Sequence, residues 1–375
     1  MESRRRMYQP PWHPDPSRTI AILPSIACRD AMSLLPEIPF DHALWYQRLA
    51  LFRHYWPGVL VSFTIALAAT FIADNHGGPT MLYALLLGMS LHFLSEEGRC
   101  QAGVELAARS VLRLGVCLLG ARITAEHVVA LGIGPVLTVV LGVATTLLAG
   151  WGLARLLGLG KDLGLLTGGA VAICGASAAL AIAAVLPRHA HAERQTILTV
   201  VGVTTLSTVA MIVYPLLVGT LGLDEVGAGI FLGGTIHDVA QVVGAGYMIS
   251  ESAGDYATFV KLLRVAMLVP VVLVLSLVFR AHQGAERPPL LPAFLVGFII
   301  LVAVNSTGLI PEGVGGAISM FSRWCLVTAI AALGIKTSFQ KLAVVGWRPV
   351  LLLVLETLWL GLLVLAALLS GAVVT

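Results

Sequence analysis

The stretch Gly233–Gln241, GGTIHDVAQ, places a histidine, an aspartate and a glutamine inside a run that is otherwise apolar from about 226 to 249. Two adjacent glycines followed by β-branched and polar residues favour an interruption of a helix at this point. The flanking halves, 226–234 and 239–249, would each be about 15 Å long, which is half the thickness of a bilayer core. We therefore predict a helix break near the midplane of a membrane, with a second half-helix that begins at Asp238.

The composition is that of a multi-span membrane protein. Of the 375 residues, 58% are hydrophobic and 11% are charged, whereas soluble domains carry roughly 25% charged residues. The formal net charge of +3 is too small to indicate a nucleic-acid partner. The cysteines are odd in number and show no C-x-x-C spacing, which argues against a disulfide framework and a zinc site. We expect neither a metal nor a cofactor.

Hydrophobic segments of about 20 residues, the length that a spanning helix needs, follow one another along most of the chain. We predict an all-α membrane fold with about eleven such segments, separated by short polar or Gly/Pro-rich loops. The segments are roughly 57–74, 80–95, 104–121, 135–155, 163–186, 196–219, 226–249, 259–280, 290–309, 316–335 and 349–372.

Residues 1–56 form a Pro- and Arg-rich extension before a transmembrane domain at 57–375. The extension lacks the apolar core of a cleavable signal peptide. Its arginines place the N-terminus in the cytoplasm by the positive-inside rule, and alternate counting places the C-terminus outside.

One loop, PRHAHAERQ, contradicts alternate counting because its arginines fall outside. If 163–186 entered and left the membrane from the cytoplasm, and 226–249 entered and left from outside, every short loop would obey the positive-inside rule. Eleven full spans and two re-entrant segments therefore both stay open.

An internal repeat relates Arg109–Leu141 to Arg323–Leu355 at an offset of 214 residues, without a gap. Ten of the 33 aligned positions are identical, among them glycines and a proline outside the apolar runs. The two copies are third and tenth among the expected segments, so their orientations are opposite. An inverted-topology repeat of this kind is typical of secondary transporters.

Ionisable residues at membrane depth are costly and usually functional. His237 is of the residue type that titrates near neutral pH, and Asp238 beside it could exchange a proton or bind a cation. We predict a substrate or ion site at this break, formed by Thr235, His237, Asp238 and Gln241. The structural alternative is that His237 and Asp238 pair with each other and with Gln241 to hold helices together.

A second break is predicted within Leu165–Pro187, at its central CGAS. Free N–H groups there would form a cradle for an anion, so we add Cys174, Gly175, Ala176 and Ser177 to the predicted site. The alternative is close helix packing on small residues. Both breaks would expose unpaired backbone groups to lipid unless protein surrounds them. We therefore expect the two breaks to meet near the midplane.

Three further polar residues are secondary candidates for the site. Lys261 and Arg264 stand at the start of an expected span, where long cationic side chains can extend to the membrane surface, and we favour that interpretation. Asn305 is expected to pair across helices.

Four motifs, LRLGVCLLGARIT, ICGASA, IHDVAQVVGAG and LLRVAMLVP, resemble those of the YeiH-type family, whose members are labelled sulfate exporters. The resemblance runs from about residue 55 to 370. It implies a multi-pass protein of the bacterial inner membrane, related to cation:proton antiporters and bile-acid symporters, with discontinuous helices. Matching the motifs residue by residue singles out Cys174, Gly175 and Ala176 in one, and His237, Asp238, Ala240 and Gln241 in the other. The long N-terminal extension departs from the family pattern.

Taken together, the sequence predicts a secondary transporter that exports or exchanges a small anionic solute, sulfate or a related anion, coupled to H⁺ or Na⁺. The expected partners are this solute, the coupling ion and the lipid bilayer, with a homodimer left open. The alternatives are a channel-like pore lined by the same motifs and, less favoured, an intramembrane enzyme that uses Cys174 or His237. Walker and Rossmann patterns are absent, so no ATP-driven mechanism is indicated.

Overall fold

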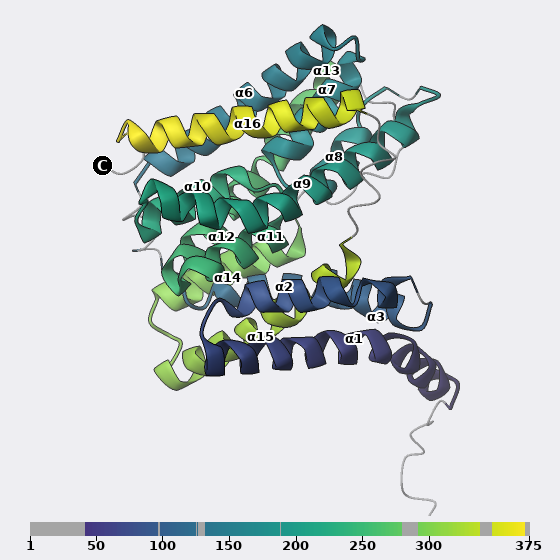
Figure 1. Ribbon diagram of the computed structural model, residues 1–375, viewed down its shortest axis with the longest axis vertical. Coiled ribbons are helices and arrows are strands. Elements are labelled where there is room, and N and C mark those ends of the chain that lie inside the picture. The colour runs from purple at the N-terminus through teal and green to yellow at the C-terminus, as the bar shows by residue number, and fades with distance from the viewer. Residues whose placement is uncertain are drawn as a thin grey trace, which may run out of the picture. The chain divides into compact units, whose positions relative to one another are not determined.

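The computed structural model describes residues 42–96, 98–124, 126, 132–187, 189–279, 292–337 and 347–371. Within these ranges the ordered elements are helices, and none of the residues is in a strand (Figure 1). Most of the predicted N-terminal extension lies outside the described residues. The first helix already begins at residue 42, so the end of that extension is helical.

Within the described part of the chain, six helices are long and apolar enough to cross a membrane. They are α1 (His42–His76), α6 (Gly134–Leu156), α9 (Ala192–Leu221), α12 (Glu251–Ala266) continued by α13 (Leu268–Val278), α15 (Glu312–Lys336) and α16 (Trp347–Leu369). The membrane fold is therefore confirmed in its coarse form.

Six of the eleven expected segments coincide with these long helices, and the other five contain shorter or interrupted ones. A total of eleven spans stays a prediction. The shorter elements are α2 (Thr80–Ser90), η1 (His92–Ser95), α3 (Gly98–Leu106), the π-helical turn η2 (Ala107–Val111), α4 (Leu112–Leu119), α7 (Lys161–Ala172), α8 (Ala176–Ala183), α10 (Glu225–Thr235), α11 (Val239–Ile249) and α14 (Ala293–Ser306).

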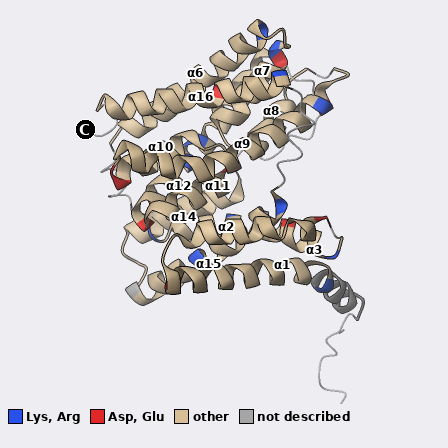
Figure 2. Ribbon diagram, viewed as in Figure 1, with Lys and Arg blue, Asp and Glu red and all other residues tan. Residues whose placement is uncertain are grey.

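Polar side chains cap the starts of two helices. The Asp224 carboxylate accepts a hydrogen bond from Gly227 N–H at the start of α10, at 2.9 Å. The Ser250 hydroxyl accepts one from Ala253 N–H at the start of α12, at 3.1 Å. Each cap satisfies one of the N–H groups that a helix start leaves unpaired. Charged residues gather near helix ends, and only a few lie within the helices (Figure 2).

Apart from α1, which contacts α3 at Gly58, the helices pack into two groups. We call α2, α3, α4, α14 and α15 the first bundle, and α6 to α13 with α16 the second bundle. Glycines allow the closest approaches: a Cβ at Gly334 of α15 would overlap the backbone of α2. Helix α11 packs against α2 and α15, so this interrupted segment lies where the two bundles touch.

Both segments predicted to be broken are broken, and each folds back on itself. Helix α7 ends at Ala172 and α8 begins at Ala176, and a Cβ at Gly169 would overlap the Ile182 side chain. These two residues would be roughly 20 Å apart along a straight helix. We call α7, the turn 173–175 and α8 the first hairpin.

The second hairpin consists of α10, the turn 236–238 and α11. A Cβ at Gly229 would lie 3.0 Å from the Ala253 oxygen, and one at Gly246 would lie 3.2 Å from the same oxygen. A straight helix would separate these glycines by about 25 Å. The fold-back is the geometry that the re-entrant alternative requires, and it argues against a straight span at either segment.

Candidate functional site

The turns of the two hairpins touch each other. The Ala176 N–H at the start of α8 donates a hydrogen bond to the Asp238 carboxylate at 3.3 Å. Gly175, with φ of +62°, packs so closely against this carboxylate that a Cβ would overlap it. A glycine is needed here both for the left-handed backbone and for the close approach. The expected meeting of the two breaks is therefore observed, while a binding role for it stays a prediction.

Two basic side chains of α12 bind the carbonyl groups at the end of the first helix in each hairpin. The Lys261 ammonium donates to the Ile173 oxygen at 2.7 Å and to the Ile236 oxygen at 3.0 Å. Lys261 and Arg264 are 0% and 1% exposed, respectively. The interpretation that these side chains extend to the membrane surface is wrong, because both are buried and lie near the middle of the span Glu251–Val278 that α12 and α13 form.

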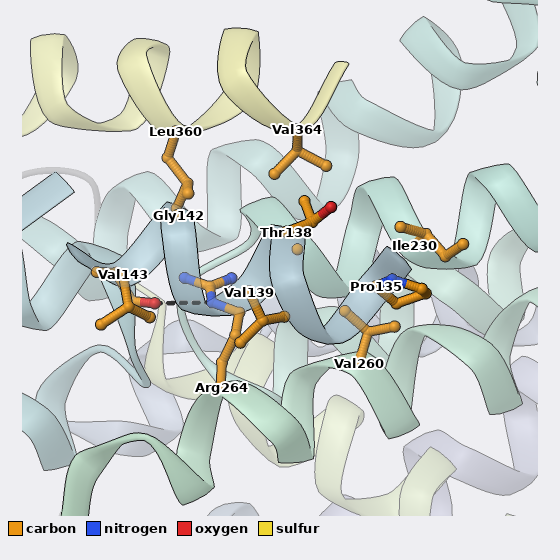
Figure 3. A pocket seen from close by; sticks show the side chains of 12 residues that line it. Pro135, Thr138, Val139, Gly142, Val143, Ile230, Val260, Arg264, Leu360 and Val364 are labelled. Carbon is orange, nitrogen blue, oxygen red and sulfur yellow. Dashed lines mark hydrogen bonds between the residues drawn. The ribbon is translucent and has the colours of Figure 1, made fainter. Parts of the chain in front are cut away.

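The Arg264 guanidinium has several N–H donors, and it binds four backbone oxygens. Its guanidinium donates to Val171 and Ala172 in α7, at 2.6 and 2.8 Å. It also donates to Gly233 and Ile236 of the second hairpin, at 3.1 and 2.9 Å. The side chain adjoins a cavity of about 10 Å³ between α6, α10, α12 and α16, which has room for about one water molecule (Figure 3).

These bonds compensate the unpaired carbonyl groups that a broken helix leaves at its end. The last carbonyls of a helix lack partners and carry a partial negative charge. Lys261 and Arg264 satisfy such carbonyls at the ends of both α7 and α10. The beginnings of α8 and α11 carry the opposite partial charge. The meeting point of the hairpins therefore combines two basic side chains and two helix N-termini with the carboxylate of Asp238.

The polar residues of GGTIHDVAQ bind to different elements and not to one another. His237 Nε2 lies 3.0 Å from the Thr357 hydroxyl of α16. Asp238 N–H donates to the Ser207 hydroxyl of α9 at 3.0 Å, and Gln241 donates through Nε2 to Thr208 at 3.3 Å. The alternative in which His237, Asp238 and Gln241 pair among themselves is therefore not what the structure contains.

These groups differ in their exposure to solvent. His237, Gln241, Lys261 and Arg264 are buried, whereas Asp238 is partly exposed. In the first hairpin the same division separates buried Cys174 from Ala176 and Ser177, which retain exposure. The accessible part of the meeting point thus consists of the Asp238 carboxylate and the start of α8.

Cys174 and Ser177 interact with each other: Sγ and Oγ are 2.8 Å apart, and the Ser177 hydroxyl also donates to the Cys174 oxygen at 3.1 Å. Neither contact provides a base that could activate the thiol as a nucleophile. The arrangement gives no support to the enzyme alternative.

Two other predicted residues lie apart from the meeting point. Thr235 is buried and donates to the Phe231 oxygen of its own helix at 2.6 Å. Asn305 of α14 donates to the Ile123 oxygen, beyond the end of α4, at 3.2 Å. This bond joins α14 to the loop after α4 within the first bundle, and a pairing of Asn305 with another helix stays a prediction.

Sequence reasoning missed Glu356, which is 0% exposed in the middle of α16. Its Oε1 lies 2.7 Å from the Thr167 hydroxyl of α7. The signal was present in the sequence: Glu356 is the one acidic residue in the otherwise apolar segment 349–372.

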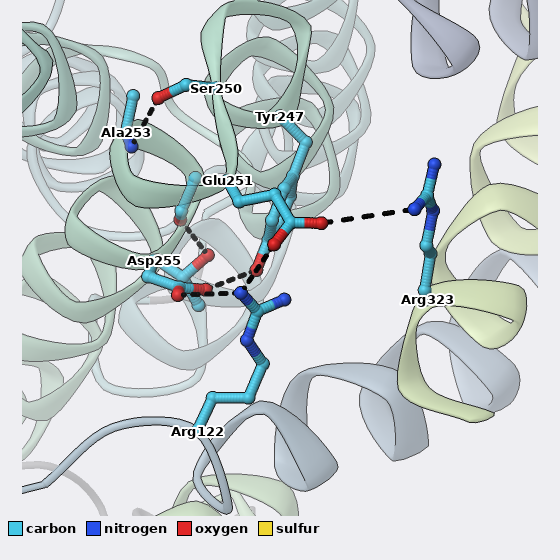
Figure 4. A network of polar contacts seen from close by, with 9 residues as sticks. Arg122, Tyr247, Ser250, Glu251, Ala253, Asp255 and Arg323 are labelled. Carbon is cyan, nitrogen blue, oxygen red and sulfur yellow. Dashed lines mark hydrogen bonds and ion pairs between the residues drawn. The ribbon is translucent and has the colours of Figure 1, made fainter. Parts of the chain in front are cut away.

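An ion-pair cluster joins the two bundles beside α11 (Figure 4). Arg122, just after α4, lies 2.9 Å from Glu251 and 3.5 Å from Asp255, and Arg323 of α15 lies 3.9 Å from Glu251. Tyr247 donates to Asp255. The cluster borders a cavity of about 70 Å³ that is lined from both bundles.

No group of three or more metal-ligating side chains is found in the part of the chain that the structure describes. The site therefore consists of backbone dipoles, two cations, one accessible carboxylate and hydroxyl groups, which is a set suited to binding and releasing a small ion.

Comparison with known proteins adds close relatives. A family model described as conserved hypothetical protein 698 matches residues 57–353. A UPF0324 membrane protein of Chlorobaculum tepidum is 55% identical over 321 residues, which cover 84% of this chain and 90% of the relative. The UPF0324 membrane protein TauZ of Paracoccus denitrificans is 53% identical over 315 residues, which cover 82% of this chain and 93% of TauZ.

Proposed function

The chain belongs to the UPF0324 membrane protein family, and from this premise we propose that it is a secondary transporter which exports or exchanges a small anion. The YeiH-type family that the sequence motifs resemble is this same family. Sulfate or a related anion is the first substrate class to test, and H⁺ or Na⁺ is the coupling ion.

The observation that carries the proposal is the meeting of the two hairpins around Lys261 and Arg264. Broken helices inside a bundle are the usual means by which transporters present helix ends to an ion. Here the two buried cations already occupy the carbonyl ends. The remaining helix ends are N-termini, which attract negative charge. The excess of positive over negative charge at this point favours an anion as the substrate.

The protonation state of Asp238 can control anion binding. Its carboxylate accepts from the first N–H of α8, so it lies where a substrate anion would bind. An ionised Asp238 competes with the anion for this position. A protonated Asp238 loses its charge and leaves the N-terminus to the substrate. Anion binding should therefore strengthen as pH falls, because the competing carboxylate becomes neutral.

We further propose that an inverted repeat underlies the architecture. Arg109 and Lys336 share Glu105 in ion pairs. At the offset of 214 residues, the equivalents of these two basic residues are Arg323 and Arg122, which share Glu251. The carboxylates themselves are not equivalent, because the position that corresponds to Glu105 is Ser319. Crosswise sharing of this kind is expected when two copies are related by a two-fold axis.

The later parts of the two copies support the same relation. Trp359 of α16 donates through Nε1 to the Thr145 hydroxyl of α6 at 3.4 Å. These residues are also 214 positions apart, so equivalent residues contact each other, as happens on a two-fold axis. The inverted repeat in turn favours a transporter over a channel or an enzyme.

The proposed location is the inner membrane of a bacterium, with the N-terminus in the cytoplasm. Two re-entrant hairpins, the first entered from the cytoplasm and the second from outside, let the short loops obey the positive-inside rule. In this topology the Arg122–Glu251 cluster lies toward the outside and the Glu105–Lys336 pair toward the cytoplasm. The outer cluster joins the bundles, whereas the inner pair lies within the first bundle.

The test is sulfate uptake into proteoliposomes that contain the full chain. Wild-type protein should take up sulfate with saturable kinetics. A pH gradient, with the inside either more acidic or more alkaline than the outside, should change the rate of uptake. Asp238→Asn should insert normally, and its affinity for sulfate should no longer change with pH. Asp74→Asn, an exposed carboxylate at the end of α1, is the matched control and should behave as wild type.

Thermal stability with and without sulfate, at two pH values, provides the binding readout, because a ligand that binds the folded state stabilises it. Stabilisation of wild type should be larger at the lower pH, and Asp238→Asn should be stabilised equally at both. Flux that does not saturate would indicate a channel. A pH response that survives in Asp238→Asn would contradict the role given to this carboxylate.

A further inference from the structure

Glu356 is a carboxyl group in the interior of the second bundle whose partners do not suit a negative charge. It is 0% exposed and lies where α16 crosses a glycine-lined contact between α6 and α7; a Cβ at Gly150 would lie 2.6 Å from its Oε1. Oε2 is buried and finds no hydrogen-bond partner among the described residues. A buried carboxylate without a compensating group is very costly.

The hydrogen bonds of Thr167 indicate that the Glu356 carboxyl group carries a proton. The Thr167 hydroxyl lies 2.7 Å from Glu356 Oε1 and 2.9 Å from the Leu163 oxygen. A hydroxyl has only one hydrogen to donate. If Glu356 were ionised, Thr167 could make a full hydrogen bond to the carboxylate or to the Leu163 carbonyl, and the other acceptor would share that hydrogen at best. If Glu356 carries a proton on Oε1, it donates to Thr167, which in turn donates to Leu163.

No charge from the neighbouring helices compensates Glu356. Helices α6, α7, α9 and α10 pack against α16, and Glu356 forms no ion pair with a described residue of any of them. Their charged residues stand near helix ends: Arg155 in α6, Lys161 and Asp162 in α7, Glu193 and Arg194 in α9, and Glu225 in α10. The uncharged Tyr214 of α9 faces α16 further along, where its hydroxyl would lie 3.9 Å from a Cβ at Gly361. In α16 itself, Arg348 stands in the first turn. Of the groups at the hairpin turns, His237 contacts the adjacent Thr357.

The contacts of α16 connect this carboxyl to both hairpins. Thr167, the partner of Glu356, belongs to α7 of the first hairpin. Thr357, the next residue, binds His237 of the second hairpin. The Thr146 hydroxyl, one turn before Gly150 in α6, is also buried without a partner among the described residues. Movement of the hairpins relative to α16 would therefore change the surroundings of Glu356 directly.

From this geometry we propose that Glu356 is a proton-binding site of the transporter. It holds a proton while the contact between α6, α7 and α16 is closed. When the contact opens, water reaches the carboxyl, the O–H bond breaks, and the proton passes to water as hydronium while the electron pair stays on the carboxylate. Rebinding of a proton allows the contact to close. This role in coupling rests on the proposed function, whereas the protonated state does not.

The protonated state is tested by infrared spectroscopy of the purified full chain. Wild-type protein at neutral pH should show the carbonyl stretching band of a protonated carboxylic acid, and Glu356→Gln should lack that band. Glu105→Gln, which alters a half-exposed ion-paired carboxylate, should keep it. Identical spectra for wild type and Glu356→Gln would overturn the proposal.

Thr167→Val provides a second variant that keeps the carboxyl group. Loss of the hydroxyl partner should move the band of Glu356 in frequency without abolishing it. An unmoved band would overturn the assigned hydrogen bond, and this arm serves equally if Glu356→Gln does not fold.

Coupling is tested with sulfate and a pH indicator enclosed in proteoliposomes. Wild type should move protons together with sulfate. Glu356→Gln should still exchange internal for external sulfate and should lose the proton movement. Proton movement at the wild-type rate in this variant would overturn the coupling role. If wild type itself moves no sulfate, the proposed function fails for this anion, while the infrared result still decides whether Glu356 carries a proton.

Discussion

The two hairpins end their first half-helices alike and begin their second half-helices differently. Both α7 and α10 end on carbonyls that Lys261 and Arg264 satisfy. Helix α8 begins with an N–H that binds the Asp238 side chain. Helix α11 follows Asp238 itself, whose N–H is held by Ser207 of α9.

The two kinds of contact therefore have different roles. The cations hold the hairpins in place, and the Asp238 carboxylate controls access to the start of α8. The carbonyl ends are fixed by two buried cations that belong to one helix. The start of α8 is bound by a partly exposed carboxylate from the other hairpin. A change in protonation can release the second contact and leaves the first one intact. Substitutions at the two contacts therefore have different expected effects.

Arg264→Ala should produce the largest loss of stability. It removes hydrogen bonds from a charged donor to carbonyls of both hairpins, and each such bond contributes about 1.5–3 kcal/mol. We expect a loss of several kcal/mol in the free energy of unfolding, measured by thermal unfolding in detergent. Arg264→Lys, which keeps the charge and loses donors, should be intermediate.

Arg109→Ala is the matched control, because this arginine is exposed and pairs with Glu105 on the surface. Exposed ion pairs contribute about 0–1 kcal/mol. If Arg264→Ala were no more destabilising than Arg109→Ala, buried cations would not be the support of the hairpins.

Gly175→Ala should disturb the contact between the hairpins at a smaller cost. The backbone φ of +62° disfavours any side chain, and the new Cβ would overlap the Asp238 carboxylate. We expect a loss of about 1–3 kcal/mol, together with a sulfate-dependent thermal shift that differs from that of wild type.

Gly152→Ala provides the comparison within α6, where a Cβ would meet no atom within 4 Å. Since alanine is the better helix former, this substitution should stabilise the protein by up to about 1 kcal/mol. A similar loss in both variants would mean that the loss does not arise at the hairpin contact.

Ser207→Ala should have the smallest effect of the three. It leaves the Asp238 N–H without its 3.0 Å partner, at a cost of about 1 kcal/mol. Ser90→Ala, whose hydroxyl binds only within its own helix, should change stability by less than about 0.5 kcal/mol. Equal melting temperatures for the two variants would show that Ser207 does not hold the turn.

The breaks could be predicted because their causes are local. Gly233 and Gly234 weaken a helix, and His237 and Asp238 cannot face lipid, so the position of the second turn follows from the chain itself. The first turn follows in the same way from Gly175. The binding partners of these residues, such as Ser207 and Thr357, come from distant helices, and no local pattern specifies them.

The expected surface position of Lys261 and Arg264 is wrong for a local reason as well. The expected span begins only at 259, just before Lys261, because Glu251 and Asp255 make the preceding residues polar. The Ser250 cap with an acidic residue after it was the signal for an earlier helix start. Eight further residues before the expected start move Lys261 and Arg264 into the interior.

The order of the helices along the chain has a consequence for biosynthesis. Both hairpins precede α12, so the ribosome completes α7 and α10 before it makes Lys261 and Arg264. Until then, the carbonyls at their ends have no partner in the hydrocarbon region, which a membrane does not tolerate. The nascent hairpins must therefore wait in a wetter setting, at the membrane surface or inside the insertion machinery. The arrival of one helix then allows both to enter together.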